Sequence, residues 1–537
     1  MVKGKKYGIL IMISALLIVL AAACSSKTDN AAQSPAPWGE QGTVDKPITL
    51  TFFDKNTGDL FTNPVAMEIT KRTGITLEIQ QPTGDPEEKL NLMLTSNSLP
   101  DIVLMDRNSD IVNKYIAANA IIPLNDLIDE YGPNIKEMYG DVLTKSRHTD
   151  GSNYYLNNWY GMDTDPLWSF NMRADILKEF GYADKLENGD SFTQEEFIDL
   201  LRQFKAKYPE VDGKPSIPLT FHADQSTVIM ETFRGMYGMK TYYEQDGNIA
   251  LDVKHPRYKE MMSFINDLQI EGLLDKEWAI NKEQIYEQKA SSNRVFVVGG
   301  FEPIEPNRLL REQHGEDTDK QYMAFKVTAP GIDPAQTTYG PRSSLGWDAI
   351  AITTANKHPE ETMKLMDFLA SEEGQYLLLW GVENEHWDLV DGKHVPRPEV
   401  LQGFKDNWGE YSKRTGIRKW VWFVNNGSGS DGTPYDLVAK YERNKYNEHA
   451  IKSMKDSNWD TAIYNNLGPA GGTPDALTEQ KLKDLTSQGF TKLAYAETKD
   501  EFEQLHTKLL SDLEANKVAQ IEQLYTENYK KRLELWK

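Results

Sequence analysis

The sequence predicts an α/β protein built from at least two lobes, and three observations lead to this prediction. Short apolar strands alternate with amphipathic helices, a pattern typical of parallel sheets covered by helices. The chain has 537 residues, and 514 remain after a leader of 23, which is more than one hydrophobic core usually serves. No second long apolar run follows Cys24, so the remainder is expected to fold as globular lobes.

The first predicted sheet begins with the strand 48–53, in which apolar and polar residues alternate. Asn63-Pro64 is a typical helix start, and the strand 75–79 follows that helix. Asp85-Pro86 opens a second helix, which leads to the short apolar strand 102–105. This order predicts parallel strands joined by right-handed crossovers.

A second α/β region is predicted from about Asn171. Thr193 and Glu196 form a capping box before a helix whose apolar residues recur at helical spacing. Further strands are expected at 217–219, 294–298 and 349–352, and further helices at 359–369, at 372–380 and after the capping box of Thr498 and Glu501.

The N-terminus has the three parts of an export signal. Lys3, Lys5 and Lys6 precede an apolar run, and three alanines precede Cys24, the only cysteine. The junction resembles a lipobox, in which the cysteine is acylated; Ala21 stands where leucine is usual. The alternative is an uncleaved anchor, but the apolar run 8–23 is shorter than the ~20 residues of a spanning helix. We therefore predict a signal peptide at 1–23, a flexible polar tether at 24–46, and a lipid-anchored protein on the outer face of the cytoplasmic membrane.

Composition excludes some partners and favours others. The formal charge is -22, and it becomes -25 when the three leader lysines are removed, which argues against nucleic acid as a partner. Twelve Trp, 25 Tyr and 19 Phe make up 10% of the chain. Most are expected to pack in cores, but exposed rings would suit the apolar faces of sugars.

An ordered set of segments resembles a known family. The segments are 73–75, 88–94, 98–102, 171–177, 347–353, 359–361, 365–369, 372–374 and 380–383. Together they resemble the family 1 extracellular solute-binding proteins of ABC importers, above all the large Gram-positive lipoproteins linked to polysaccharide uptake. Relatives that bind acidic oligosaccharides often carry a calcium loop, but residues 208–215 lack its spaced oxygen ligands, so no metal and no cofactor is predicted.

The resemblance implies a two-lobed, type II periplasmic-binding-protein-like fold, with a hinge, a ligand cleft between the lobes and a helical C-terminal region. We expect lobe crossings near Asn171, Pro330 and Gly374. These divide the chain into 47–170 with 331–374 as lobe 1, and 171–330 with 375–537 as lobe 2. The implied function is capture of an oligosaccharide by a monomeric binding protein and its delivery to the membrane permease of an ABC transporter.

The candidate ligand-binding residues are aromatic and polar side chains expected at strand ends and crossings. They are Trp347, Asp348, Asp106, Arg107, Tyr155, Asn157, Trp159, Trp168, Glu302, Trp380, Glu383 and Trp387. The alternative role is core packing for Trp347, a surface ion pair for Asp106 and Arg107, and a rigid cluster beside the hinge for the residues between 155 and 168. Trp420 and Trp422 alternate in a predicted strand and are expected in the core.

Two other functions are open at this point. A secreted glycosidase or lyase needs two carboxylates across a cleft, but 81 acidic residues make such pairs frequent by chance. No catalytic triad or zinc-ligand spacing is present, and Gly427–Gly432 matches a dinucleotide motif only in its glycines, so it is interpreted as a turn. A sugar-sensing lipoprotein without a transporter would have the same sequence features.

Overall fold

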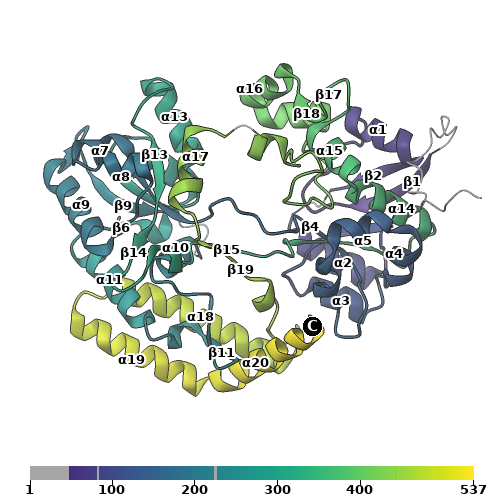
Figure 1. The fold of residues 1–537 in the computed structure, drawn as a ribbon. Helices are drawn as coiled ribbons and strands as arrows, with labels where there is room; N and C mark the ends of the chain where they lie inside the picture. The colour runs from purple at the N-terminus through teal and green to yellow at the C-terminus, as the bar shows by residue number, and fades with distance from the viewer. Residues whose placement is uncertain (1–46, 82–83, 223–226, 442) are drawn as a thin grey trace, which may run out of the picture. The chain divides into compact units, whose positions relative to one another are not determined.

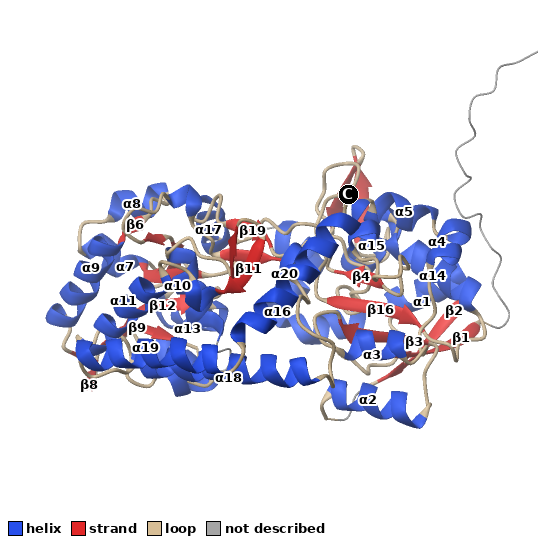
Figure 2. Cartoon of the chain, turned by 90° about the horizontal axis from the view of Figure 1, so that it is seen from below, coloured by secondary structure: helices blue, strands red, loops and turns tan. Residues whose placement is uncertain are grey.

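The computed structural model describes residues 47–81, 84–222, 227–441 and 443–537. The predicted leader, Cys24 and the tether lie outside the described residues. The described residues contain two principal sheets, each with its own hydrophobic core (Figures 1 and 2). In the described part of the chain, no helix combines the length and the apolar composition that a membrane crossing requires.

The first sheet has five strands in the order β2-β1-β3-β16-β4. β1 is parallel to β2 and β3, as predicted, whereas β16 is antiparallel to both β3 and β4. Successive residues of β3 and β16 point to opposite faces: Leu104 and Ile350 lie in one core, Met105 and Ala349 in another. The strands are β1 (Ile48–Phe53), β2 (Ile75–Gln80), β3 (Ile102–Asp106), β4 (Leu156–Asn158) and β16 (Asp348–Ile352).

Helices cover both faces of this sheet, which with them forms the first lobe (Figure 2). The predicted caps are confirmed, since Asn63 and Asp85 accept hydrogen bonds from the first turns of α1 and α2. The helices are α1 (Pro64–Thr73), α2 (Pro86–Ser96), α3 (Ile111–Ala117), α4 (Asn125–Tyr131), α5 (Pro133–Tyr139), α6 (Asp141–Lys145), α14 (Pro359–Ala370), α15 (Glu372–Trp380) and α16 (Pro398–Thr415); the hairpin is β17 (Trp387–Val390) with β18 (Lys393–Pro396).

The second sheet has the order β13-β5-β12-β9 and is the centre of the second lobe. Its strands are β5 (Ser169–Arg173), β9 (Ile217–Phe221), β12 (Val295–Gly300) and β13 (Tyr322–Phe325). The capping box of Thr193 and Glu196 is confirmed at α9, and Thr498 caps α19. The helices are α7 (Ala174–Glu179), α8 (Ala183–Asn188), α9 (Gln194–Lys207), α10 (Thr227–Met236), α11 (Tyr258–Ile270), α12 (Glu283–Ala290), α13 (Ile304–His314), α17 (Lys445–Ser453), α18 (Pro474–Ala494), α19 (Lys499–Ala515) and α20 (Val518–Leu535).

Short strand pairs complete the fold. They are β6 (Phe192–Thr193) with β14 (Val327–Thr328), β7 (Glu210–Val211) with β8 (Lys214–Pro215), β10 (Tyr242–Gln245) with β11 (Asn248–Leu251), and β15 (Gly340–Arg342) with β19 (Asn458–Asp460). Asp212 and Gly213 join β7 to β8 with positive φ angles, so the segment compared above with a calcium loop is a tight hairpin. Among the described residues, no group of three or more His, Cys, Asp or Glu is arranged to hold a metal ion.

The chain crosses between the two cores at places that differ from the expected ones. Three crossings lie between Tyr160 and Trp168, between Tyr339 and Leu345, and between Leu437 and Tyr446. After them the chain reaches the first core again at Ala462 and at Trp536. Residues 375–437, which we expected in lobe 2, therefore pack in the first lobe. The sequence did not reveal this because the C-terminal half of α15 is buried on all sides and has no distinct apolar face.

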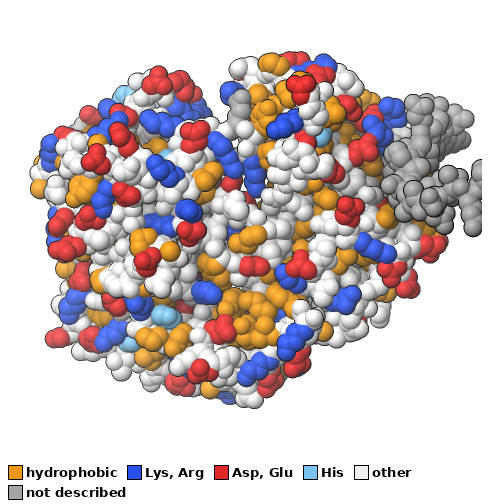
Figure 3. All heavy atoms as spheres, viewed as in Figure 1, with side chains coloured by type: hydrophobic (Ala, Val, Ile, Leu, Met, Phe, Trp, Pro, Cys, Tyr) orange, Lys and Arg blue, Asp and Glu red, His pale blue; other side chains and the backbone are white. Residues whose placement is uncertain are grey.

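The buried tryptophans of 380–422 explain why this segment stays with the first sheet. Trp380 donates a hydrogen bond to the carbonyl of Tyr435, and Trp422 packs against Phe52 of β1. Trp420 and Trp422 are in the core, as predicted, but in a loop and not in a strand. Acidic and basic side chains are intermixed over the surface seen in Figure 3.

Candidate functional site

Two tryptophans meet where strands of the first sheet end. Asp348, the first residue of β16, pairs with Asn158 at the end of β4 and with Asp106 at the end of β3. Because β16 and β4 are antiparallel, the residue before Asp348 and the residue after Asn158 come to the same edge of the sheet. These residues are Trp347 and Trp159, and their rings stack with centroids 5.5 Å apart and planes at 12°.

A third tryptophan and an arginine extend this aromatic surface. The Arg418 guanidinium lies 5.3 Å from the ring centre of Trp159 and 5.1 Å from that of Trp408. Asp436 holds Arg418 through two hydrogen bonds of 2.8 and 2.6 Å. Trp347 is 46% exposed and Trp408 43%, so both rings face solvent. We call Trp159, Trp347, Trp408 and Arg418 the tryptophan platform.

Two bulky residues of the platform have positive φ angles. Trp159 and Arg418, which contact each other, have φ angles of 58° and 57°. Such angles are unfavourable for residues with a bulky side chain, and functional sites are where proteins commonly retain them. The strain thus supports a role for the platform beyond packing.

Buried charges support the platform from beneath. Asp348 is 1% exposed and pairs with Lys55 at 2.7 Å; burial raises the pKa of Asp348, and Lys55 opposes this rise. Burial also raises the pKa of Asp54, which accepts a 2.8 Å hydrogen bond from the Trp422 indole. These buried contacts hold the end of β1 and the start of β16 in place beneath the platform.

Other predicted residues at this edge have anchoring contacts. Arg107 is 4% exposed and donates to the Gly346 carbonyl at 2.7 Å, while its backbone N–H donates to the Trp347 carbonyl at 2.8 Å. Asn157 is buried between Ser146 and the Leu345 carbonyl. Asp106 is exposed at the strand end, and Tyr155 is half-buried in a pocket beside Arg107.

The remaining predicted residues are not brought to the platform. Trp168 packs in the second core, with its ring 4.0 Å from that of Phe301. Glu302 of the second lobe is half-buried and accepts a hydrogen bond from Asn447, and burial raises its pKa. Trp380 and Trp387 are buried in the first core, and Glu383 lines a separate pocket beside Trp387.

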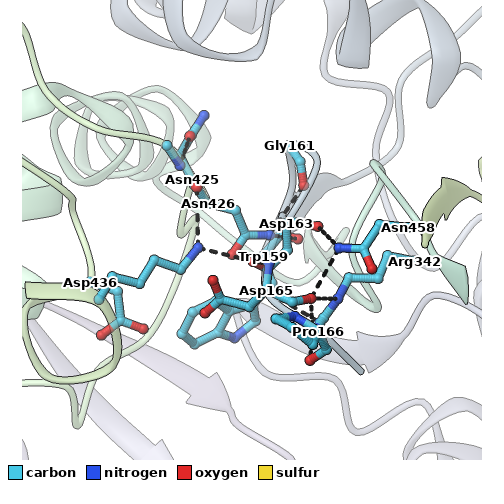
Figure 4. Close-up of polar contacts among 12 residues, drawn as sticks. Trp159, Gly161, Asp163, Asp165, Pro166, Arg342, Asn425, Asn426, Asp436 and Asn458 are labelled. Carbon is cyan, nitrogen blue, oxygen red and sulfur yellow. Dashed lines mark hydrogen bonds and ion pairs between the residues drawn. The ribbon is translucent and has the colours of Figure 1, made fainter. Parts of the chain in front are cut away.

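The three crossings are tied together next to Trp159 by ion pairs and amide contacts, shown in Figure 4. On the first crossing, Asp163 pairs with Arg342 at 3.2 Å and with Lys440 at 3.1 Å, while Asp165 makes two 2.9 Å bonds to Arg443. Burial acts to raise the pKa of Asp163, but Arg342 and Lys440 outweigh it and lower that pKa. We call these five side chains the crossing network; it links the three crossings named above.

Sequence reasoning missed three residues at the platform and all five side chains of the crossing network. Lys55 follows β1, and the strand-end argument applied to Asp106 would have found it. Trp408 and Arg418 have no such signal, because Trp408 follows a non-helical residue within α16 and Arg418 lies in an irregular loop.

Comparison with known proteins gives matches to one family. The model of the bacterial extracellular solute-binding proteins matches residues 54–376. The fructooligosaccharide ABC transporter substrate-binding protein FusA of Streptococcus pneumoniae serotype 4 is 26% identical over 405 residues, 71% of each chain. The polygalacturonan/rhamnogalacturonan-binding protein YtcQ of Bacillus subtilis is 24% identical over 342 residues, 62% of this chain and 65% of YtcQ.

Solved structures have the same fold. An extracellular solute-binding protein from Bifidobacterium longum subsp. infantis superposes with a TM-score of 0.70 at 17% identity, covering 92% of this chain and all of that chain. The structure of FusA in complex with kestose has a TM-score of 0.61 at 18% identity and covers 90% of this chain and 99% of FusA. At these identities the likeness concerns the fold alone.

Proposed function

Because the chain belongs to the bacterial extracellular solute-binding proteins, we propose that it captures an oligosaccharide at the tryptophan platform and delivers it to the permease of an ABC transporter. One observation carries the proposal: two stacked tryptophans, one of them 46% exposed, lie at a sheet edge beside all three lobe crossings. The saccharides after which FusA and YtcQ are named support a saccharide as the ligand.

The chemistry of the platform suits a sugar. A pyranose or furanose ring presents C–H groups that pack on an aromatic face, and its hydroxyls need hydrogen-bonding partners at the rim. Trp347 and Trp408 would supply the faces, while Arg418 and Asp106 would supply polar partners at the rim.

Delivery would require a conformation that the permease can distinguish from the unliganded one. Rotation of two lobes about a hinge, which closes them around a ligand, is a known way to give the liganded protein a distinct conformation. The crossing network would be the part that bends, since each of the three crossings carries at least one of its side chains. The second lobe would then contribute Glu302 and Phe301, which lie near the first crossing.

The lipid anchor belongs to the same proposal. The basic start, the apolar run and the single cysteine of the leader support export and acylation at Cys24. A tether of 22 residues after Cys24 would let the folded lobes reach a neighbouring permease. Mass spectrometry of the membrane-extracted protein tests this: a diacylglyceryl mass on Cys24 is expected, and an unmodified N-terminus would contradict it.

The proposal also assigns no catalytic step to the protein, because the relatives are named as binding proteins. A thermal-shift screen of residues 25–537 against neutral and acidic oligosaccharides tests capture. A sugar at a concentration of 100 times its dissociation constant should add about 2.7 kcal/mol to the free energy of unfolding. Chromatography of each hit should recover intact sugar; a cleaved sugar would favour a carbohydrate-active enzyme instead.

The variant Trp347→Ala tests where the sugar binds. Removing this exposed ring should raise the dissociation constant about 30-fold, or ~2 kcal/mol, with little loss of folding stability. Titration calorimetry measures the affinity, and Tyr208→Ala is the matched control, because Tyr208 is a half-buried aromatic residue at the end of α9 in the second lobe. Equal affinity in wild type and Trp347→Ala would remove Trp347 from the site.

A further inference from the structure

A second pocket lies between the first lobe and the C-terminal end of α20, and its volume is about 240 Å³. Arg107, Lys145 and Arg147 line it from the first lobe, and Lys531 and Arg532 line it from α20. We call it the basic pocket. None of the tryptophans of the platform lines it, so it is a separate site.

The charge of the basic pocket is unusual for this chain. The protein has 81 acidic residues, yet none of the described residues that line the pocket is Asp or Glu. Lys145 pairs with Asp141 of its own helix at 2.6 Å. Within the described residues, no carboxylate pairs with Arg147, Lys531 or Arg532. The fold therefore brings together positive charges that lack a neutralising partner inside the pocket.

One of these cations, Arg107, is buried, and its charge acts on the half-buried Arg532. Arg107 donates only to neutral oxygens, among them those of Gly346, Ser343 and Asn465, and burial lowers its pKa. Burial and the charge of Arg107 lower the pKa of Arg532 to about 10. Asp106 and Asp460 act on Arg107 from outside the pocket and do not line it. Buried like charges are costly unless an anion comes between them.

The other lining residues indicate more than a bare ion. Asn113, Asn466 and Asn528 provide amide groups that can both donate and accept hydrogen bonds. Tyr155 and Trp536 provide ring surfaces, and Lys145 lies 5.6 Å from the ring centre of Trp536. Cations, amides and aromatic rings together match a ring that carries hydroxyls and one carboxylate.

We infer that the basic pocket binds a single acidic sugar unit, a uronate, whose carboxylate lies among Arg107, Arg147, Lys531 and Arg532. The guanidinium and ammonium groups supply charge-assisted hydrogen bonds to the carboxylate. Because α20 provides two of the cations, the bound anion joins this helix to the first lobe. This site goes beyond the proposed function, which requires only that a sugar binds at the platform.

Titration of residues 25–537 with galacturonate and with galactose, followed by protein-observed NMR or calorimetry, tests the inference. Galacturonate should bind saturably, and galactose should not. The affinity for galacturonate should fall about tenfold between low and high salt, because salt screens the attraction between its carboxylate and the cations. Arg147→Gln and Lys531→Gln remove exposed cations and should each weaken galacturonate binding about tenfold. Lys530→Gln is the matched control, because Lys530 is on the same helix but contacts Asn248 of β11.

The pocket variants and the control decide whether galacturonate binds in the basic pocket. Loss of galacturonate binding in the two pocket variants but not in Lys530→Gln supports the site. Absence of saturable binding, or binding that the pocket variants leave unchanged, overturns it. Inorganic phosphate that displaces galacturonate at lower concentration would show a general oxyanion site and overturn the assignment to a uronate. Galacturonate binding that Trp347→Ala weakens and the two pocket variants leave unchanged would place the uronate at the platform and overturn the basic-pocket site, so failure of this site and failure of the platform are distinguishable.

Discussion

At the scale of single residues, the platform depends on one glycine. Gly346 has a φ of 63°, and a Cβ atom there would lie 2.0 Å from the Asn158 carbonyl oxygen. Gly346→Ala would force the loop before Trp347 away from the end of β4. We expect a loss of ~1–3 kcal/mol in the free energy of unfolding and weaker sugar binding. Urea denaturation and calorimetry measure both; Gly392→Ala, at an open hairpin turn with similar φ, is the control.

The buried hydrogen bond between Trp422 and Asp54 gives a second prediction at this scale. Trp422→Phe keeps most of the ring but removes the 2.8 Å donor to a carboxyl group that is 2% exposed. The variant should lose ~1–3 kcal/mol of stability because Asp54 stays buried with one donor fewer. Denaturant unfolding measures it, and Trp347→Phe should be close to neutral. A neutral Trp422→Phe would show that the bond contributes little.

The same residues show how far sequence reasoning reaches. Trp347 and Asp348 could be placed at a strand start from the apolar run that follows them, and Asp106 at a strand end. The partners of Trp347 could not be predicted in the same way. Contact with Trp159 depends on the β4–β16 register, and contact of Trp159 with Arg418 depends on a loop more than 250 residues away in sequence. Local patterns contain no information on such pairings.

At the scale of elements, α17 covers the open edge of the second sheet. β13 is an edge strand, and the carbonyl of its Ala324 accepts hydrogen bonds from His449 and Ser453 of α17. Since a carbonyl can only accept, Nε2 of His449 carries the proton. Burial lowers the pKa of His449 to about 4. The helix thus protects the edge with a histidine that stays neutral in the folded state.

This histidine predicts a pH dependence of stability. Between pH 6.5 and about 4 the unfolded chain protonates this residue and the folded protein does not, so stability falls as the pH falls. The contribution lost across that range is ~3 kcal/mol. His449→Gln keeps an amide donor and does not titrate, so its stability should decline less on acidification than that of wild type. Parallel slopes of unfolding free energy against pH in the two proteins would contradict this.

Among the elements, those with local signals were predicted and those defined by tertiary contacts were not. The strands 48–53, 75–79 and 102–105 and the capped helices after Asn63, Asp85, Thr193 and Thr498 are confirmed. The third crossing was placed about 70 residues too early, because α15 resembles a helix of either lobe. Its position depends on Trp380, Trp420 and Trp422, whose packing partners are distant in sequence.

At the scale of the whole molecule, the crossing network should restrain the lobes. Arg443→Ala removes both 2.9 Å bonds to Asp165 on another crossing. We expect a broader distribution of distances between the lobes and an affinity for sugar changed about fivefold. The protein without Cys24 contains no cysteine, so spin labels at Lys393→Cys and Lys214→Cys report the distance by double electron–electron resonance.

The control for this experiment is Arg308→Ala, which also removes an arginine with two carboxylate partners, but within the single helix α13. Its distance distribution should match that of the wild type. If Arg443→Ala also matched the wild type, the ion pairs at the crossings would not limit the movement of the lobes.

Helix α20 has a mechanical consequence. Its residues Val518, Ile521, Tyr525 and Tyr529 pack in the second core, while Trp536, just past its end, packs against the first core and donates to the carbonyl of Lys145 (Figure 1). A continuous helix fastened at both ends acts as a strut between the two cores, in addition to the three chain crossings. Two bodies joined in this way have little freedom to twist or slide, which leaves rotation about one axis. A short carboxyl-terminal extension would therefore begin beside a contact between the two lobes, and we expect a fusion partner placed there to hinder their rotation.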